Sequence, residues 1–157
     1  MKPKTVLVPL DGSKLAEEAL AHAIAFGRDG ATLVLVRAAE SHATPLTDPT
    51  IAQIAAVQEA EVYLATVADR LRRVGVADVE TSVQYGGPVD GIADVARTRN
   101  VDLIAMSTHG RSGLGRLVLG SVAEGVVRAT STPILLLRPN ACVAGEDGLA
   151  MSAERRQ

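Results

Sequence analysis

Residues 101–128 read VDLIAMSTHGRSGLGRLVLGSVAEGVVR, and this stretch joins an apolar strand to a helix through a loop rich in glycine, serine and arginine. The first N–H groups of a helix lack partners within the helix and carry partial positive charge. Bare backbone, hydroxyl groups and arginines between a strand end and a helix start therefore favour binding of an anion such as phosphate. We expect a strand over 101–106, an anion-binding loop and a helix over 121–129; a sharp turn without a ligand is the alternative.

Four further runs of the sequence have the pattern of strands. Residues 5–10 and 31–39 are apolar with little alternation, which is typical of strands buried on both faces of a parallel sheet. Residues 79–85 alternate between apolar and polar positions, which indicates a half-exposed strand near a sheet edge. Residues 133–137, PILLL, form the last expected strand.

Helix signals lie between these strands. Ser13 is placed to cap a helix that ends near Gly27. Asp48 followed by Pro49 starts a long helix, and Gly75 stands just past its end. The long helix carries an apolar stripe, typical of a helix packed on a core, formed by Ile54, Val57, Leu64, Val67, Leu71 and Val74.

Strands and helices that alternate along the chain predict an α/β fold. A short helix that follows Gly86–Pro88 and ends near Asn100 completes five strands and four helices. Right-handed crossovers then give a doubly wound, open parallel sheet, for which we expect the strand order 3-2-1-4-5. Ligands of such sheets bind beyond the strand ends where the chain reverses direction, here between the first and fourth strands. Asp11 would therefore face residues 106–113 across one crevice.

The composition fits one soluble globular domain and argues against several kinds of partner. The 157 residues are 47% hydrophobic and 22% charged, which allows a sizeable core. A net charge of -2 and only three aromatic residues, Phe26, Tyr63 and Tyr85, do not suit a nucleic-acid binder. The single cysteine, Cys142, cannot form an intrachain disulfide, so a reducing compartment such as the cytoplasm is expected. We expect neither a signal peptide nor a membrane span.

The loop fails two generic phosphate-binding motifs. Gly110 and Gly115 have P-loop spacing, but Arg116–Leu117 occupies the positions of the required lysine and hydroxyl residue. A dinucleotide fingerprint that begins at Gly113 fails at Val118. A phosphate-binding loop here must therefore belong to another class of protein.

The loop resembles the nucleotide-binding motif of the universal stress proteins, which reads glycine, two residues, glycine, nine residues, then Gly-Ser or Gly-Thr. Here nine residues separate Gly110 from Gly120–Ser121, and Ser107 stands at the first glycine position. The opening VLVPLDGSKLAEEAL and the closing TPILLLRP also resemble that family. The likeness covers roughly residues 3–139 and implies an adenine-nucleotide alpha-hydrolase-like (Rossmann-like) fold. We expect one domain over 1–139 and a disordered tail over 140–157.

The resemblance implies a site for an adenine nucleotide, above all ATP, with magnesium recruited by the phosphates and Asp11 rather than by a metal site of the protein alone. Asp11 would reach a ribose hydroxyl, and the backbone near Ala38 would meet the adenine edge. Ser107 departs from the motif, because its Cβ and hydroxyl group enter beside the ribose or phosphates. The implied binding residues are Pro9, Leu10, Asp11, Ala38, Met106, Ser107, Gly110, Arg111, Gly113, Gly120, Ser121 and Val122.

Several of these residues also have a purely structural interpretation. Ser121 and Glu124 match a capping box, in which each side chain accepts a hydrogen bond from a helix N–H group. Asp11 could simply order the turn that follows it, and Gly110 and Gly113 could supply positive φ angles. No histidines have metal-ligand spacing, and no catalytic set of side chains is visible.

The leading hypothesis is a cytoplasmic stress-response protein in which nucleotide occupancy biases conformation or partners, with slow hydrolysis at most. A nucleotide-free homodimeric scaffold is the alternative, and a weak nucleotide hydrolase ranks lowest. The resemblance also implies a homodimer formed through the last strand. Its continuous apolar residues on a predicted sheet edge need pairing or covering: Ile134, Leu135, Leu136 and Leu137.

Overall fold

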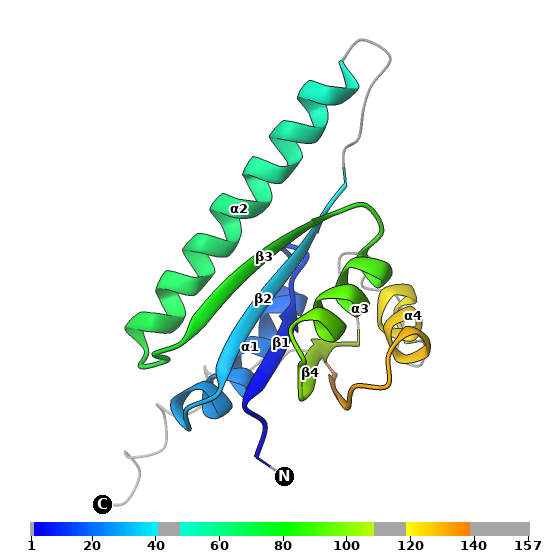
Figure 1. The fold of residues 1–157 in the computed structure, drawn as a ribbon. Helices are drawn as coiled ribbons and strands as arrows, with labels where there is room; N and C mark the ends of the chain where they lie inside the picture. Colours follow the sequence, from blue (N-terminus) through cyan, green and yellow to red (C-terminus); the bar gives the residue numbers. More distant parts are fainter. Residues whose placement is uncertain (1, 41–47, 109–118, 139–157) are drawn as a thin grey trace, which may run out of the picture.

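The computed structural model describes residues 2–40, 48–108 and 119–138. The elements are β1 (Thr5–Pro9), α1 (Lys14–Arg28), β2 (Thr32–Ala39), α2 (Pro49–Arg73), β3 (Val79–Tyr85), α3 (Pro88–Thr98), β4 (Leu103–Ser107), α4 (Ser121–Ala129) and β5 (Ile134–Leu137). The strands form one parallel sheet in the order β3-β2-β1-β4-β5 (Figure 1). The predicted fold class and strand order are confirmed. The expected tail over 140–157 lies outside the described residues.

Helices cover both faces of the sheet. One core packs α1 and α2 against the sheet, and a second core packs α3 and α4 against its other face (Figure 1). Successive residues of β1 alternate between the two, with Val6 and Val8 in the first core and Leu7 in the second. This double burial explains why the sequences of β1 and β2 are almost continuously apolar.

The predicted helix signals are confirmed at α1 and α2. The Oγ atom of Ser13 accepts a hydrogen bond of 3.1 Å from the backbone N–H of Ala16. Asp48 caps α2 by accepting a 2.7 Å hydrogen bond from the backbone N–H of Thr50. Gly75 follows α2 with a φ of +92°, a conformation in which glycine avoids the steric cost of a side chain.

The apolar stripe predicted for α2 is correct in the middle of the helix and wrong at its ends. Leu64, Val67 and Leu71 are buried, whereas the exposed fractions are 53% for Ile54 and 43% for Val74. Figure 1 shows the reason at the N-terminal end, where α2 extends past the carboxyl ends of β2 and β3. Val74 instead contributes its backbone carbonyl, which accepts hydrogen bonds from Nε and Nη2 of Arg28 at 2.9 and 2.6 Å.

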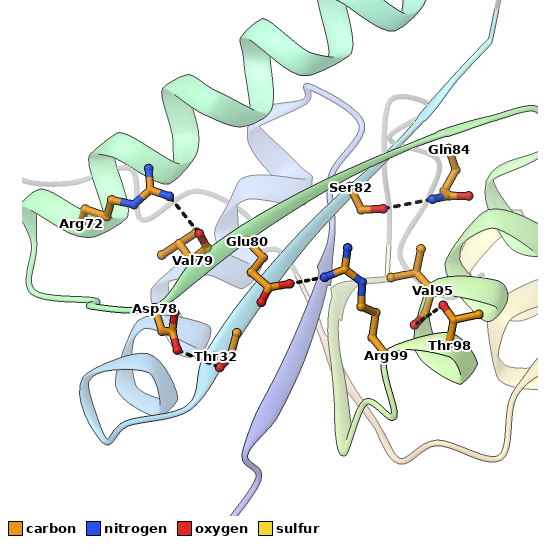
Figure 2. Close-up of polar contacts among 10 residues, drawn as sticks. All are labelled: Thr32, Arg72, Asp78, Val79, Glu80, Ser82, Gln84, Val95, Thr98 and Arg99. Carbon is orange, nitrogen blue, oxygen red and sulfur yellow. Dashed lines mark hydrogen bonds and ion pairs between the residues drawn. The ribbon is translucent and has the colours of Figure 1, made fainter.

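Polar contacts fix the edge strand β3 to its surroundings (Figure 2). Nη2 of Arg72 on α2 donates a 2.9 Å hydrogen bond to the carbonyl oxygen of Val79. Glu80 forms an ion pair with Arg99, which directly follows α3. The most polar strand of the sheet therefore lies at an edge, as predicted, and charged side chains occupy its surface.

A carboxylate fixes the start of the central strand. Oδ2 of Asp102 accepts hydrogen bonds from the backbone N–H groups of Lys4 and Thr5 at 2.8 and 3.0 Å. These two bonds hold the pKa of Asp102 below its usual value, because they stabilise the ionised form. The segment before β4 is thereby fixed to the segment before β1.

Candidate functional site

The carboxyl ends of β1, β2 and β4 open into a cleft of about 370 Å³. β1 lies between β2 and β4 in the sheet, so the cleft is at the predicted reversal of chain direction. The apolar part of its wall includes Val36, Ile92 and Met106, which belong to the core shared with α3 and α4. The cleft thus combines an apolar surface with the polar ends of several elements.

The predicted binding residues that the structure describes all line this one cleft. They come from four separate parts of the chain, namely the ends of β1, β2 and β4 and the start of α4. These residues are Pro9, Leu10, Asp11, Ala38, Met106, Ser107, Gly120, Ser121 and Val122. Gly110, Arg111 and Gly113 lie outside the described residues.

A tight turn holds Asp11 at the cleft. Oδ1 of Asp11 accepts a 2.9 Å hydrogen bond from the backbone N–H of Ser13, and Gly12 between them has a φ of +84°. The structural interpretation of Asp11 is therefore confirmed, because the side chain orders the turn before α1.

Ser107 and Thr108 are buried at the end of β4. The backbone of Thr108 connects the end of β4 to β5 and α4. Its N–H donates to the carbonyl oxygen of Leu137 on β5, and its own carbonyl oxygen accepts from the N–H of Gly120 before α4, both at 2.8 Å. Strand alternation places Ser107 on the face of Ala105, which packs in the core with α1, and Met106 on the other face. The Cβ of Ser107 therefore lies on the α1 side of the sheet.

The capping box predicted for α4 is wrong. Gly120 is the N-cap residue, and no described side chain caps this helix. The 2.9 Å hydrogen bond from the N–H of Glu124 to the carbonyl oxygen of Gly120 makes Ser121 the first helical residue, one position too late to cap. Glu124 instead pairs with Arg128 at 2.6 Å. Residues 120–123 line the cleft, so the uncapped helix start faces it.

Arg37 also lines the cleft, although the sequence analysis gave it no role. Its exposed fraction is only 8%, and its Nη2 atom lies 2.9 Å from Oε1 of Glu59 on α2. Its Cζ atom lies 4.8 Å from the centre of the Tyr63 ring, a distance at which a cation and an aromatic ring attract each other. The sequence feature that could have identified Arg37 is its position as a lone arginine within an apolar strand, since a buried charge requires a partner.

Tyr63 extends this cluster to α1. Its hydroxyl group donates a 2.8 Å hydrogen bond to Oε1 of Glu17, and Arg70 pairs with Oε2 of the same carboxylate at 2.6 Å. Burial and the contact with Glu17 raise the pKa of Tyr63 well above its usual value, because both disfavour the phenolate. Tyr63 therefore remains a neutral donor throughout the physiological range of pH.

Within the described ranges, no group of three or more histidine, cysteine, aspartate or glutamate side chains is arranged to hold a metal ion. In the same parts of the chain, every helix is too short or too polar to cross a lipid bilayer.

Comparison with known proteins identifies relatives of the whole domain. The sequence model of the universal stress protein family matches residues 2–138. A universal stress protein relative from Staphylococcus aureus strain USA300 is 32% identical over 139 residues, which cover 86% of this chain and 84% of that protein. The structure of universal stress protein UspA from Lactobacillus plantarum has a TM-score of 0.75 at 24% identity, over 88% of this chain and 99% of that one.

Two further solved structures of the same fold are described as nucleotide complexes. A universal stress protein in complex with cAMP has a TM-score of 0.66 at 23% identity, over 88% of this chain and 99% of that one. The universal stress protein from Archaeoglobus fulgidus in complex with dAMP has a TM-score of 0.62 at 21% identity, over 87% of this chain and 98% of that one. At these identities the likeness shows the fold.

Proposed function

The chain belongs to the universal stress protein family, and we propose that it binds an adenine nucleotide, ATP above all, in the cleft between β1 and β4. One observation carries the proposal: a single cleft brings Asp11 and the uncapped start of α4 together at the chain reversal. Nucleotide binding by two proteins of the same fold, one with cAMP and one with dAMP, supports the choice of an adenine nucleotide.

The cleft suits such a ligand in size and in chemistry. A volume of about 370 Å³ lies within the usual range for small-molecule sites. The apolar wall at Val36 and Met106 can pack against a base, with the Ala38 backbone at its edge. Asp11 would accept a hydrogen bond from a ribose hydroxyl.

The phosphates would lie at the start of α4, where the N–H groups of residues 121–122 and the helix dipole favour negative charge. Gly110, Arg111 and Gly113 are proposed as further phosphate contacts from the family motif. Phosphate oxygens and Asp11 would hold magnesium, since this ion prefers oxygen ligands and retains much of its water shell.

We assign the nucleotide a regulatory role in one domain that spans 1–139 and acts in the cytoplasm. Occupancy would stabilise one conformation of the domain by the difference in affinity between its conformations. No residue is assigned a catalytic role, and hydrolysis would be slow at most.

The test is to denature the purified protein, identify any released nucleotide by chromatography, and measure thermal unfolding with added ATP. We expect an adenine nucleotide in the supernatant or a rise in melting temperature that saturates with ATP. ATP at 100 times its dissociation constant would stabilise the fold by about 2.7 kcal/mol. GTP and the variant Asp11→Ala are the controls, and both should give smaller shifts. No released nucleotide and no shift at millimolar ATP would refute the proposal.

The second candidate is a nucleotide-free homodimeric scaffold. β5 supports self-association because it lies at a sheet edge, and the exposed fraction of Leu136 there is 36%. The two candidates share the dimer and differ in the ligand, so the release experiment separates them.

A further inference from the structure

We propose that Arg37 is a positioning residue for the nucleotide site, because its guanidinium group fixes the turn of Asp11 and Gly12 against α2. The position of α2 would then set the position of the Asp11 carboxylate, and the ligand and α2 would influence each other through this arginine. The proposal rests on the proposed function where it concerns the ligand, whereas the position of Arg37 beside the turn is independent of it.

The first step concerns the direction of the Arg37 side chain. Residues of β2 alternate between the two cores, with Leu33 and Leu35 on the side of α1 and α2 and Val34 and Val36 on the other side. Arg37 therefore points to the side of α1 and α2. Its contacts with α2 confirm this direction.

The second step concerns the position of the guanidinium group beside the turn. A Cβ atom placed on Gly12 would lie 3.6 Å from each of Cζ, Nη1 and Nη2 of Arg37. Within the guanidinium plane, a point at equal distances from these three atoms would lie much closer to them than 3.6 Å. The Cβ position must therefore lie above or below that plane. The flat face of the guanidinium group is therefore turned toward Gly12, in the turn that carries Asp11.

The third step concerns α2, which holds the same guanidinium group by two contacts. Glu59 pairs with Nη2 at 2.9 Å, and the Tyr63 ring centre lies 4.8 Å from Cζ. Glu59 itself lines the cleft. Tyr63 also donates to Glu17, so α1 and α2 are held together next to the arginine. Arg37 thus lies between α2 and the turn that precedes α1.

Arginine suits this role better than lysine. A guanidinium group is planar, so it can stack on a turn and a ring while it donates to a carboxylate in its own plane. A lysine at position 37 would keep the charge opposite Glu59 and lose the flat face. The variant Arg37→Lys therefore separates the ion pair from the support of the turn.

The first experiment needs no nucleotide and measures hydrogen exchange of the Ser13 and Ala16 amides by NMR. Both amides donate to side chains of the turn, to Asp11 and Ser13 respectively. In Arg37→Met we expect both to exchange about tenfold faster, with Arg37→Lys in between. Arg70→Met is the matched control, because it removes an ion pair of Glu17 from the same pair of helices without touching the turn. Equal exchange in Arg37→Met, Arg70→Met and wild type would overturn the proposal.

The second experiment measures the affinities for ATP, 2′-deoxy-ATP and 3′-deoxy-ATP. In wild type and Arg70→Met the protein should discriminate against loss of the hydroxyl that Asp11 contacts, by about tenfold. In Arg37→Met this discrimination should fall toward the value for Asp11→Ala, and the double variant should lose little more. Preserved discrimination in Arg37→Met would also overturn the proposal. A wild-type protein that binds no ATP refutes the proposed function instead, and hydrogen exchange then decides the role of Arg37.

Discussion

Single residues decide how closely a ligand can approach the cleft, and Ser107 is the clearest case. It ends β4, lines the cleft and stands where the family motif has glycine. Glycine lets backbone approach a ligand closely because it has no Cβ. The side chain of Ser107 occupies part of that space on the α1 side of the sheet. The residue therefore has a direct effect on nucleotide affinity under the proposed function.

Replacing Ser107 with glycine should tighten ATP binding by about three- to tenfold, because the change removes the Cβ and the hydroxyl group. The same change should lower the free energy of unfolding by about 0.5–1 kcal/mol, since glycine weakens a strand. Isothermal titration and urea denaturation measure the two effects. Ser107→Ala is the control that separates the hydroxyl from the Cβ. Weaker ATP binding by Ser107→Gly would show that the serine contributes a favourable contact.

Part of the site can be predicted from the identities of its residues. The sequence indicates Asp11 because it stands in a polar turn that follows an apolar strand at the expected chain reversal. The spacing of Ser121 and Glu124 predicts a cap at Ser121, but the helix starts one residue earlier than that spacing requires. Arg37 was missed because its partners Glu59 and Tyr63 are on α2, and their distance to β2 depends on how that helix packs.

At the scale of elements, α3 and α4 pack closely against each other at Gly125. A Cβ placed on Gly125 of α4 would lie 2.6 and 3.1 Å from the two γ-carbons of Val89 on α3. A β-branched side chain cannot clear this space by rotation, since one methyl group replaces the other. The absence of a side chain at Gly125 therefore sets the distance between two helices that flank the cleft.

Gly125→Ala should lower the free energy of unfolding by about 1–2 kcal/mol, because overpacking outweighs the higher helix propensity of alanine. In a Val89→Ala background the same substitution should be neutral or stabilising by up to about 1 kcal/mol, since the clash is removed. Urea denaturation of the four proteins of this cycle measures the coupling. Equal stabilisation by Gly125→Ala in both backgrounds would contradict the close packing of α3 on α4.

Element types and order were predictable because apolar runs, caps and glycines all agree with the same fold. Most predicted ends lie within two residues of those observed. The ends of the buried stripe of α2 were not predictable, because burial of Ile54 depends on how far the helix extends past the sheet. Sequence periodicity describes the face of a helix and contains no information about the length of its neighbours.

At the scale of the whole molecule, the proposed homodimer would cover the β5 edge. Leu136→Lys should raise the dimer dissociation constant by at least about tenfold, because a charge on an edge strand opposes pairing with a second copy. Sedimentation velocity over a range of protein concentrations measures this change. Val62→Lys is the control, since Val62 has an exposed fraction of 68% on α2, away from β5. A wild-type protein that remains monomeric, or a dimer lost only in Val62→Lys, would contradict the prediction.

The central position of β1 also dictates the order in which the chain can fold. β1 pairs with β2 soon after it in the sequence, but its other neighbour is β4, and the bond from Lys4 to Asp102 spans 98 positions. During synthesis one edge of β1 therefore has unpaired backbone groups until β4 has been made, and such an edge is a site for misfolding and aggregation. Because the cleft lies between β1 and β4, the step that pairs β4 with β1 also creates the cleft.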